Sequence, residues 1–415
     1  MTAEGGRQLE EETMTDQERL ARYLTKPINR RGFLSMMGAS AAAAGLAACT
    51  TGSGSSASPS SAASAAAPSL APSDAPSEEP VPSYATEGEL FMYNWSDYIS
   101  PDNIDAFKAR YGIGTFQYDI YADNDVLLAT LQGGGGGYDI AAPTAEYVLG
   151  MAEEGFIQKL DMSRIPNVKH INSAFKKVWW DPNDEYQVPK DFGTTGILYR
   201  SDLLSKVPAS WREFYEMVKT EASQKTVFVT SSADVFTFPL KMLGYSINSE
   251  VKEELDEARA ILLECAPHIL ALDSDTYGDK MAAGEASLTL GWTGPLGQEL
   301  APLVDEGKAG FVNPSEGTLY WMDAWVLLAD APHPEAGYAW LNFIQEPEVQ
   351  AEETNYNLYA TCNDAAKEFV DPEILSNPAI FPPDALVAEL ESARDLAGTP
   401  QRSDILEEFK QAVGG

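Results

Sequence analysis

Short strand-like runs alternate with amphipathic, helix-like stretches from residue 87 to the C-terminus, and no other feature of the sequence narrows the possible folds as far. We predict strands at 90–93, 115–120, 138–142, 196–199, 226–230, 287–290 and 324–328. We predict helices at 103–111, 124–131, 146–154, 211–222, 251–265 and 334–343. This order predicts an α/β protein with open, largely parallel sheets covered by helices. Ligands of such sheets bind beyond the carboxyl ends of the strands, and between the lobes where there are two.

The length of the chain predicts more than one lobe. Its 415 residues exceed the roughly 250–300 that a single hydrophobic core usually organises. Hydrophobic residues make up 44% of the sequence and aromatic residues 10%, which is enough to form cores and excludes a largely disordered chain.

The charge of the chain excludes one class of partner. It has 28 Lys and Arg against 63 Asp and Glu, a net charge of −35. Nucleic acid is therefore not expected as a partner, because phosphate binding needs clustered cations. A field of this sign concentrates small cations near the protein, although acidity of this size also serves solubility alone.

The first 48 residues have the features of an export signal. Residues 29–34 (NRRGFL) open a small, apolar run that ends in Leu46-Ala47-Ala48-Cys49. We predict that residues 1–48 are a twin-arginine lipoprotein signal and that Cys49 is lipidated, since this ending resembles a lipobox. The apolar run is too short to predict a membrane-spanning helix.

Residues 49–86 are expected to form a tether. After Cys49 this segment consists mainly of Ser, Ala, Pro and Gly, and it has almost no large aliphatic side chain to bury. We predict a disordered linker that spans about 30–35 Å and holds the folded body away from a membrane surface.

Residues for common catalytic and metal sites are scarce. His170, His268 and His333 are the three histidines, and none lies in an HExxH motif. No GxSxG turn is present, and the glycine run at 133–137 lacks the Gly-Lys-Ser/Thr ending of a phosphate loop. We therefore predict no enzyme, no metal site and no cofactor.

Aromatic residues recur beside carboxylates or small polar residues near the ends of predicted strands. Residues 94–98 (NWSDY) and 291–294 (GWTG) each follow a strand, and residues 320–323 (YWMD) precede another. An aromatic face beside a carboxylate suits an organic ammonium, because the ring attracts the cation and the carboxylate accepts its N–H bonds. Each Trp taken alone is more typical of a buried core, and it is their recurrence at strand ends in an acidic chain that favours a cleft for a cation.

Several of these segments resemble the spermidine/putrescine-binding proteins of bacterial polyamine importers. The resemblance runs from residue 90 to about residue 363, and its most specific pieces are 93–98, 138–140, 154–161, 243–246 and 321–323. It implies a two-lobed, type II-like periplasmic-binding-protein fold with the ligand in the cleft between the lobes. It further implies that 87–193 with 323–368 form lobe 1, and that 194–322 with 369–415 form lobe 2.

The resemblance also implies a set of ligand-binding residues. One group is expected at an end of the polyamine: Trp95, Ser96, Asp97 and Tyr98. Trp292 and Trp321 are expected to stack on its methylenes, and Asp323 to face an amine. Tyr359 and Thr144 match two further positions of the family's site.

Two departures from the family pattern bear on the length and amine spacing of the ligand, and not on its cationic nature. Segment 230–236 is one residue shorter than usual, so Asp234 remains while Ser232 stands in for a second acid. Glu146 lies where the family tends to have an aromatic residue. We predict that Glu146 supplies a carboxylate to the cleft; the alternative is a solvated residue at a helix start.

The sequence thus predicts the substrate-binding component of an ABC importer that binds spermidine or putrescine. We expect a monomer, anchored by lipid to the extracytoplasmic face of the bacterial membrane, that delivers its ligand to a permease. The first alternative is a receptor of the same fold for another organic cation, a metal chelate or an amino sugar. The second is an exported enzyme.

Overall fold

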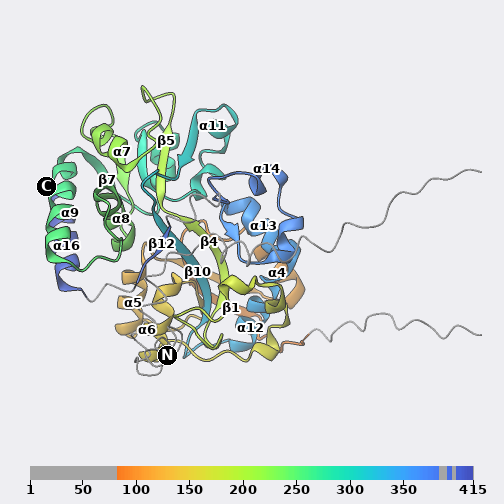
Figure 1. The fold of residues 1–415 in the computed structure, drawn as a ribbon. Helices are drawn as coiled ribbons and strands as arrows, with labels where there is room; N and C mark the ends of the chain where they lie inside the picture. The colour runs from red at the N-terminus through yellow and green to blue at the C-terminus, as the bar shows by residue number, and fades with distance from the viewer. Residues whose placement is uncertain (1–81, 383–389, 395–398, 415) are drawn as a thin grey trace, which may run out of the picture.

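A computed structural model describes residues 82–382, 390–394 and 399–414 of the chain (Figure 1). The predicted signal, Cys49 and all but the end of the predicted tether lie outside these residues. The described body contains two β-sheets with helices packed around them, which confirms the predicted α/β class.

The first sheet has seven strands. In space their order is β11-β4-β10-β3-β1-β2, and β12 pairs with β10 off this path. The strands are β1 (Glu89–Asn94), β2 (Thr115–Ile120), β3 (Ile140–Ala141), β4 (Val188–Thr194), β10 (Leu319–Leu327), β11 (Ala360–Thr361) and β12 (Glu391–Ser392).

The second sheet has five strands in the order β7-β6-β8-β5-β9. They are β5 (Gly196–Arg200), β6 (Thr226–Phe228), β7 (Ile269–Leu272), β8 (Leu288–Gly291) and β9 (Ala309–Val312). The chain passes into this sheet between β4 and β5 and returns to the first sheet between β9 and β10 (Figure 1).

The prediction of largely parallel sheets is wrong, because both sheets are mixed. Half of the strand pairs are antiparallel, and each of these includes β4, β5 or β10, the strands at the two crossings. Neighbouring strands run parallel when a helical crossover connects them. A strand that enters from the other sheet has no such crossover before it, so it runs opposite to most of its neighbours in the sheet.

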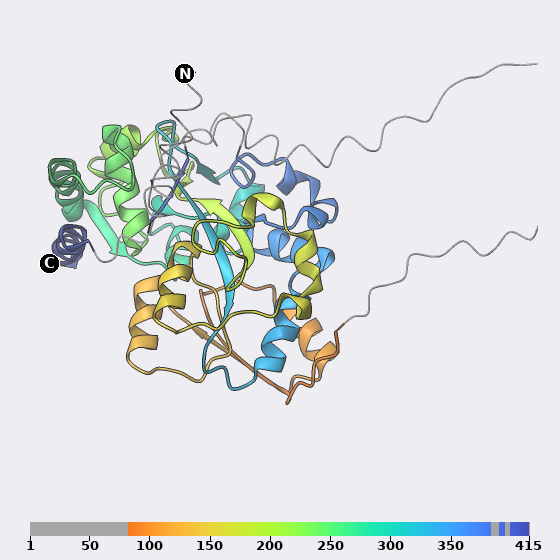
Figure 2. The same ribbon diagram turned by 60° about the horizontal axis from the view of Figure 1, so that its bottom comes forward.

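Helices cover both sheets (Figure 2). The α-helices of the first part of the chain are α4 (Pro101–Tyr111), α5 (Asn124–Gln132), α6 (Val148–Glu153), α7 (Trp211–Val218), α8 (Ser232–Leu243), α9 (Lys252–Cys265) and α10 (Tyr277–Ala282). Those of the second part are α11 (Ala301–Asp305), α12 (Pro334–Phe343), α13 (Pro347–Asn357), α14 (Pro372–Leu375) and α16 (Pro400–Gly414). Short 3-10 helices among the described residues are η1 (Ala145–Tyr147), η2 (Met162–Arg164), η3 (Pro166–His170), η4 (Ser173–Phe175), η5 (Ala266–His268), η6 (Gly294–Leu296) and η7 (Asp364–Glu368).

Local sequence signals explain several helix limits. The Asp123 side chain accepts a hydrogen bond from the Val126 N–H and caps α5. Helix α7 begins after Ser210, whose hydroxyl accepts from the Glu213 N–H in a Ser-x-x-Glu pattern. Helix α4 ends at Gly112, which has a φ of 68° and suits the left-handed conformation that glycine adopts without strain.

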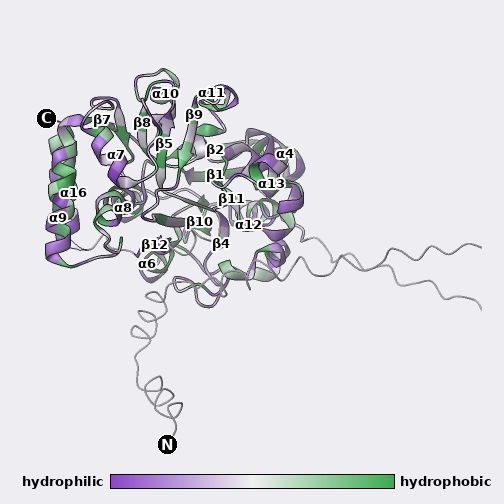
Figure 3. Ribbon diagram, turned by 45° about the horizontal axis from the view of Figure 1, so that its top comes forward, coloured by the Kyte–Doolittle hydropathy of each residue, from purple (hydrophilic) through white to green (hydrophobic). Residues whose placement is uncertain are grey.

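Each sheet has its own core. The core of the second sheet includes Trp211, Phe228 and Phe238, and that of the first includes Phe107 and Trp340. Helices α9 and α16 pack together beside the second sheet and carry both hydrophilic and hydrophobic residues (Figure 3). The two thiols that the structure describes, Cys265 and Cys362, are buried and unbonded.

The sheets divide the chain close to the predicted lobe limits, with two differences. Residues 319–322, expected in lobe 2, belong to β10 of the first sheet. Ile374 and Ile380, also expected in lobe 2, pack against a core of the first sheet. Helix α16, by contrast, contacts α8, α9 and strand β7 of the second sheet. The lobe assignment itself stays a prediction.

Among the described residues, none of the helices has the length and apolar character needed to cross a membrane.

Candidate functional site

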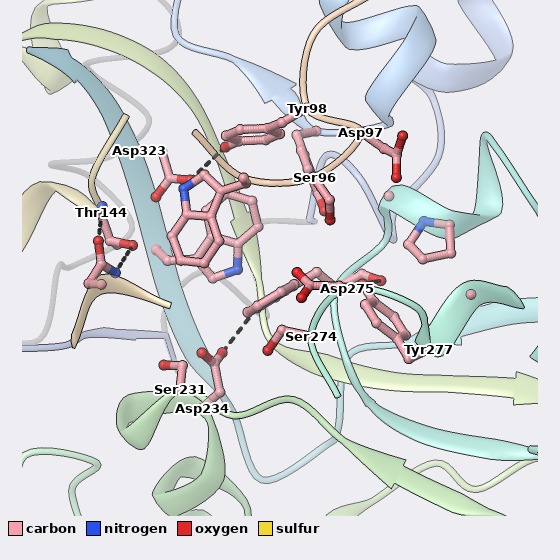
Figure 4. A pocket seen from close by; sticks show the side chains of 18 of the residues that line it. Ser96, Asp97, Tyr98, Thr144, Ser231, Asp234, Ser274, Asp275, Tyr277 and Asp323 are labelled. Carbon is pink, nitrogen blue, oxygen red and sulfur yellow. Dashed lines mark hydrogen bonds between the residues drawn. The ribbon is translucent and has the colours of Figure 1, made fainter. Parts of the chain in front are cut away.

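A cavity lies between the two sheets, at the carboxyl ends of several strands (Figure 4). Its volume of about 90 Å³ is several times the roughly 10–15 Å³ that one water needs. Ligands of open α/β sheets bind at this edge because the loops that follow the strands converge there. The cavity is therefore the candidate binding site.

The first sheet supplies one wall. Its residues come from the loop after β1, the start of α5, the segment after β3, strand β10 and the residue before β11: Trp95, Ser96, Asp97, Tyr98, Asn124, Thr144, Glu146, Tyr147, Leu319, Trp321, Asp323 and Tyr359. The second sheet supplies the other wall from the segments after β6, β7 and β8: Ser231, Ala233, Asp234, Ser274, Asp275, Tyr277, Gly278, Trp292, Gly294, Pro295, Gln298 and Glu299.

The composition of these walls is acidic and aromatic. Six of the lining residues carry carboxylates and seven carry aromatic rings, while no Lys, Arg or His is found among the lining residues that the structure describes. Carboxyl groups gathered in a cavity whose described lining residues include no cationic side chain favour a positively charged ligand, and aromatic faces attract the same kind of group.

Asp323 lies in a buried hydrogen-bonded cluster at one end of the cavity. The Tyr98 hydroxyl lies 2.6 Å from Asp323 Oδ2 and 2.5 Å from Asp191 Oδ1. Asp191 in turn accepts from the Lys190 ammonium at 2.6 Å, and both of these residues are fully buried. Burial and the neighbouring Asp191 charge raise the pKa of Asp323 to about 7.

Thr144 lies beside Asp323 through a bridge between their backbones. The Asn124 amide donates to the Thr144 hydroxyl at 2.8 Å, and the Thr144 N–H donates to Asn124 Oδ1 at 3.0 Å. These two bonds fix the loop after β3 against the start of α5 (Figure 4).

Asp234 is held by donors of the protein itself. It accepts from the Trp292 indole N–H at 3.0 Å and from the Thr195 hydroxyl. Burial raises its pKa, although the hydrogen bonds from Ser231, Thr195 and Trp292 oppose that effect. Asp234 therefore orients the Trp292 ring in the cavity.

The other end of the cavity carries further carboxylates. Figure 4 shows Asp97 and Asp275 on the side opposite Asp323 and Thr144. Burial, followed by the charges of Asp273 and Asp123, raises the pKa of Asp275, while a hydrogen bond with Ser96 opposes the shift. Burial likewise raises the pKa of Glu299. Asp97 has a φ of 48°, a left-handed conformation that Asp adopts more readily than most residues.

Aromatic rings form the middle of the cavity. The Trp321 and Tyr359 rings meet edge to face with centroids 4.9 Å apart. The Trp95 and Trp292 rings meet across the two walls with centroids 6.0 Å apart, and the Trp95 indole N–H donates to the Ala142 carbonyl at 2.8 Å. Each ring is thus fixed by a contact with the protein.

Direct contacts hold the two walls together. The Thr293 hydroxyl donates to the Leu358 carbonyl at 2.9 Å, and the Gln298 amide donates to the Asp97 carbonyl at 2.8 Å. The Thr230 hydroxyl donates to Asp123 at 3.0 Å. The described structure therefore has a closed cleft.

The structure places all but one of the predicted ligand-binding residues on the cavity wall. The exception is Ser232, since its neighbour Ser231 lines the cavity instead. Ser232 is the first residue of α8, and Ser231, Ala233 and Asp234 on either side of it line the cavity. Glu146 lines the cavity and is only 8% exposed, so it is not the solvated residue of the alternative.

The sequence analysis missed most of the wall that follows β7 and β8. Ser274, Asp275 and Tyr277 follow β7, which we did not predict because it continues directly from a helix without a turn signal. The sequence did contain one signal for this strand end: the apolar run at 269–272 is followed directly by acidic residues at 273 and 275. Glu299 lies on an irregular segment for which the sequence offers no comparable pattern.

Comparison with known proteins decides the family. Residues 103–382 match the family described as bacterial extracellular solute-binding protein. The chain belongs to this family. The resemblance that the sequence motifs indicated is therefore confirmed.

Two relatives of this solute-binding protein show how far the similarity extends. The spermidine/putrescine-binding periplasmic protein of Salmonella typhimurium is 30% identical over 337 residues, covering 80% of this chain and 93% of that protein. The putrescine-binding periplasmic protein SpuD of Pseudomonas aeruginosa is 31% identical over 330 residues, covering 76% and 89%.

Solved structures give the same result for the fold. A putative spermidine/putrescine ABC transporter protein from Listeria monocytogenes has a TM-score of 0.71 at 27% identity, covering 78% of this chain and 99% of that one. The substrate-binding protein PotD from Streptococcus pneumoniae has a TM-score of 0.64 at 28% identity, with the same coverage. The predicted periplasmic-binding-protein fold is confirmed.

Proposed function

We propose that this solute-binding protein binds a polyamine, spermidine or putrescine, in the cavity between its sheets and delivers it to an ABC permease. The observation that carries the proposal is a cavity with six carboxylates, seven aromatic rings and, among its described lining residues, no cationic side chain. The names of the relatives at 30–31% identity support the same ligand class.

The placement of the carboxylates favours a ligand with at least two cationic groups. Asp323 lies at one end of the cavity, and Asp97 and Asp275 lie on the opposite side (Figure 4). Asp323 is buried, whereas Asp97 and Asp275 are exposed to the solvent of the cleft. A ligand with one ammonium would reach one end only and would gain no charge-assisted hydrogen bond at the other. A linear diamine or triamine places an ammonium at each end.

The aromatic residues suit the carbon chain of such a ligand. Trp95, Trp292 and Trp321 lie among the carboxylates, so their rings would cover methylene groups and exclude water. An ammonium about 4 Å from a carboxylate gains roughly 4 kcal/mol at an effective dielectric of 20, before desolvation removes much of it. Two such contacts with stacked rings are compatible with micromolar binding, about −8 kcal/mol.

We infer that the protein acts as a monomer outside the cytoplasm, tethered by lipid at Cys49 after export through the twin-arginine signal. The motif at residues 29–34 and the lipobox-like ending at Cys49 support this. We also infer that the protein has no catalytic activity: its three histidines lie in no HExxH motif, and the sequence has no GxSxG turn.

The test is calorimetry with matched ligands. Putrescine and n-butylamine have the same carbon chain, but butylamine has one ammonium instead of two. We expect putrescine to bind at least tenfold more tightly, and equal binding would refute the two-ended site. Glucosamine, choline and a ferric chelate represent the alternative ligand classes, and tight binding of one of these in place of every polyamine would refute the proposal.

A variant tests the end of the cavity that carries Asp97. Asp97→Asn removes the charge and keeps a residue that tolerates the left-handed backbone. We expect putrescine affinity to fall about tenfold or more, because one ammonium loses its carboxylate. Asp161→Asn is the matched control, because Asp161 lies outside the cavity and caps η2, where Asn serves equally well.

A further inference from the structure

The Tyr98 hydroxyl lies between two carboxylates and cannot donate to both. It is 2.5 Å from Asp191 Oδ1 and 2.6 Å from Asp323 Oδ2, and all three side chains are buried. A hydroxyl carries one proton, so one of these two contacts needs a proton on the carboxyl group. Two ionised carboxylates around one buried hydroxyl would repel each other.

The surroundings decide which carboxyl group holds this proton. Asp191 is paired with the Lys190 ammonium at 2.6 Å and also accepts from the Asn357 amide at 3.3 Å. The same ammonium lies 3.4 Å from the centre of the Tyr98 ring. Asp191 is therefore the ionised member, and Tyr98 donates to it.

Asp323 is left as the protonated member. It forms no ion pair within the described residues, and burial and the Asp191 charge raise its pKa to about 7. A protonated Asp323 donates to the Tyr98 oxygen, which accounts for the second short contact. In this state the cluster of Lys190, Asp191, Tyr98 and Asp323 is electrically neutral.

Other groups around Asp323 do not change the net charge of this cluster. Thr144 has no charge, and burial raises the pKa of three further neighbours well above their ordinary values: Tyr121, Tyr359 and Cys362. Glu353 is buried behind Lys190 and Asp191, where burial raises its pKa to about 7. It accepts from Asn103 and from the Ser100 N–H and does not line the cavity.

We propose that a ligand ammonium replaces the proton of Asp323, so that binding of each polyamine releases about one proton from the Tyr98–Asp323 contact. This inference rests on the proposed polyamine function. The exchange keeps the cluster neutral, since one positive charge leaves Asp323 as another arrives. Asp191 and Tyr98 act as positioning residues, because they hold Asp323 in the form that exchanges its proton.

The proposal gives binding a definite pH dependence. Both primary amines of putrescine stay protonated below pH 8, as a Lys ammonium does, so with this ligand the titrating group belongs to the protein. With a free-state pKa of about 7 for Asp323, about 0.9 proton is released at pH 6 and about 0.1 at pH 8. The affinity therefore falls roughly tenfold from pH 8 to pH 6.

The experiment is calorimetry of the purified protein with putrescine at pH 6 and pH 8, in buffers with different ionisation enthalpies. The dependence of the observed enthalpy on the buffer gives the number of protons released. We expect close to one at pH 6 and close to none at pH 8. Binding without buffer dependence at pH 6 would overturn the inference and leave the proposed function intact, whereas absence of binding would overturn both.

Two matched variants identify the source of the proton. Asp323→Asn should weaken binding and abolish proton release at pH 6. Glu353→Gln removes the other carboxyl group whose pKa is about 7, and proton release should persist. The inference fails if release persists in Asp323→Asn or disappears in Glu353→Gln.

A third variant tests the positioning role. Asp191→Asn removes the charge that helps to raise the pKa of Asp323. Proton release at pH 6 should decrease and the midpoint of the affinity profile should move to lower pH. A purely structural role for Asp191 would weaken binding equally at pH 6 and pH 8, which would count against the proposal.

Discussion

Gly297 offers a test of cleft closure that leaves the cavity wall untouched. It lies in the segment after β8 of the second sheet and is not a lining residue. A Cβ at this position would lie 2.8 Å from the Leu358 Cγ and 2.8 Å from the Tyr356 carbonyl oxygen. Tyr356 lies in the last turn of α13, and Leu358 lies between α13 and β11 of the first sheet. Gly297→Ala therefore places the clash across the two walls.

The size of the effect follows from the contacts. One of the two clashing atoms is a backbone oxygen that cannot rotate away, and contacts under 3.0 Å force one side to shift. Inserting a methyl group into a packed contact costs about 1–3 kcal/mol. If this cost falls on the closed form alone, the dissociation constant for spermidine rises about 5- to 150-fold.

The open form should tolerate the substitution. Gly297 has a φ of −86°, which alanine adopts without strain, so the ligand-free protein should unfold at the same temperature or slightly higher. Calorimetry measures the affinity, and small-angle scattering with saturating spermidine measures the closure. Gly136→Ala is the control, because a Cβ there meets no atom within 4 Å.

Two results would refute this reasoning. Unchanged spermidine affinity in Gly297→Ala would mean that the contact with Leu358 and Tyr356 does not belong to the bound form. A large loss of stability in the ligand-free protein would mean that the two walls stay together without ligand.

Two further predictions concern the loop after β7 and the anchor. Burial raises the pKa of Asp273, but hydrogen bonds from Lys280 and from Thr276 outweigh burial and lower this pKa from 3.8 to about 2. The ionised Asp273 therefore stabilises the folded protein above pH 3.8, and this stabilisation is lost as the pH falls from about 4 to 2. Asp273→Asn should therefore lower the free energy of unfolding by about 2 kcal/mol at pH 7 and by little at pH 2, measured by urea denaturation at both pH values; an equal loss at both would contradict the assignment. Cys49→Ala should release the protein from the membrane fraction, and a variant that stays membrane-bound on fractionation would exclude the lipid anchor.

Much of the first wall could be predicted from the sequence because its residues directly follow strands with a clear pattern. Trp95 to Tyr98 come after β1, and Thr144 and Glu146 come after β3, both of which alternate with helices of the expected length. Their convergence follows from the rule for α/β sheets. The pairing of an aromatic residue with a carboxylate also indicated Trp321 and Asp323, and the family resemblance added Thr144, Glu146 and Tyr359.

The second wall was harder to predict because its residues depend on strands with weaker signals. Strand β7 follows η5 without a break, so the position of Asp275 at a strand end was not visible. Similarly, which of Ser231 and Ser232 lines the cavity depends on where α8 starts, a boundary that sequence patterns locate only to within a few residues.

Strand β4 shows why the most unusual feature of the site was invisible to sequence reasoning. All seven of its residues are buried, yet it contains the adjacent charges of Lys190 and Asp191. Charged residues inside a strand predict side chains that are exposed to solvent. The burial of Asp191 is explained only by its tertiary contacts with Tyr98 and Asn357.

The cost of burying Lys190 and Asp191 is itself an argument about function. Desolvation of two charges often exceeds their mutual attraction, so well-packed apolar residues of similar volume would be as stable or more stable. Stability therefore gives no reason to keep this pair. Apolar residues could not supply the fixed negative charge that Asp191 places 2.5 Å from the Tyr98 hydroxyl. That charge helps to keep Asp323 protonated until a cation binds. A pair retained for this purpose belongs to the binding site although it touches no part of the cavity.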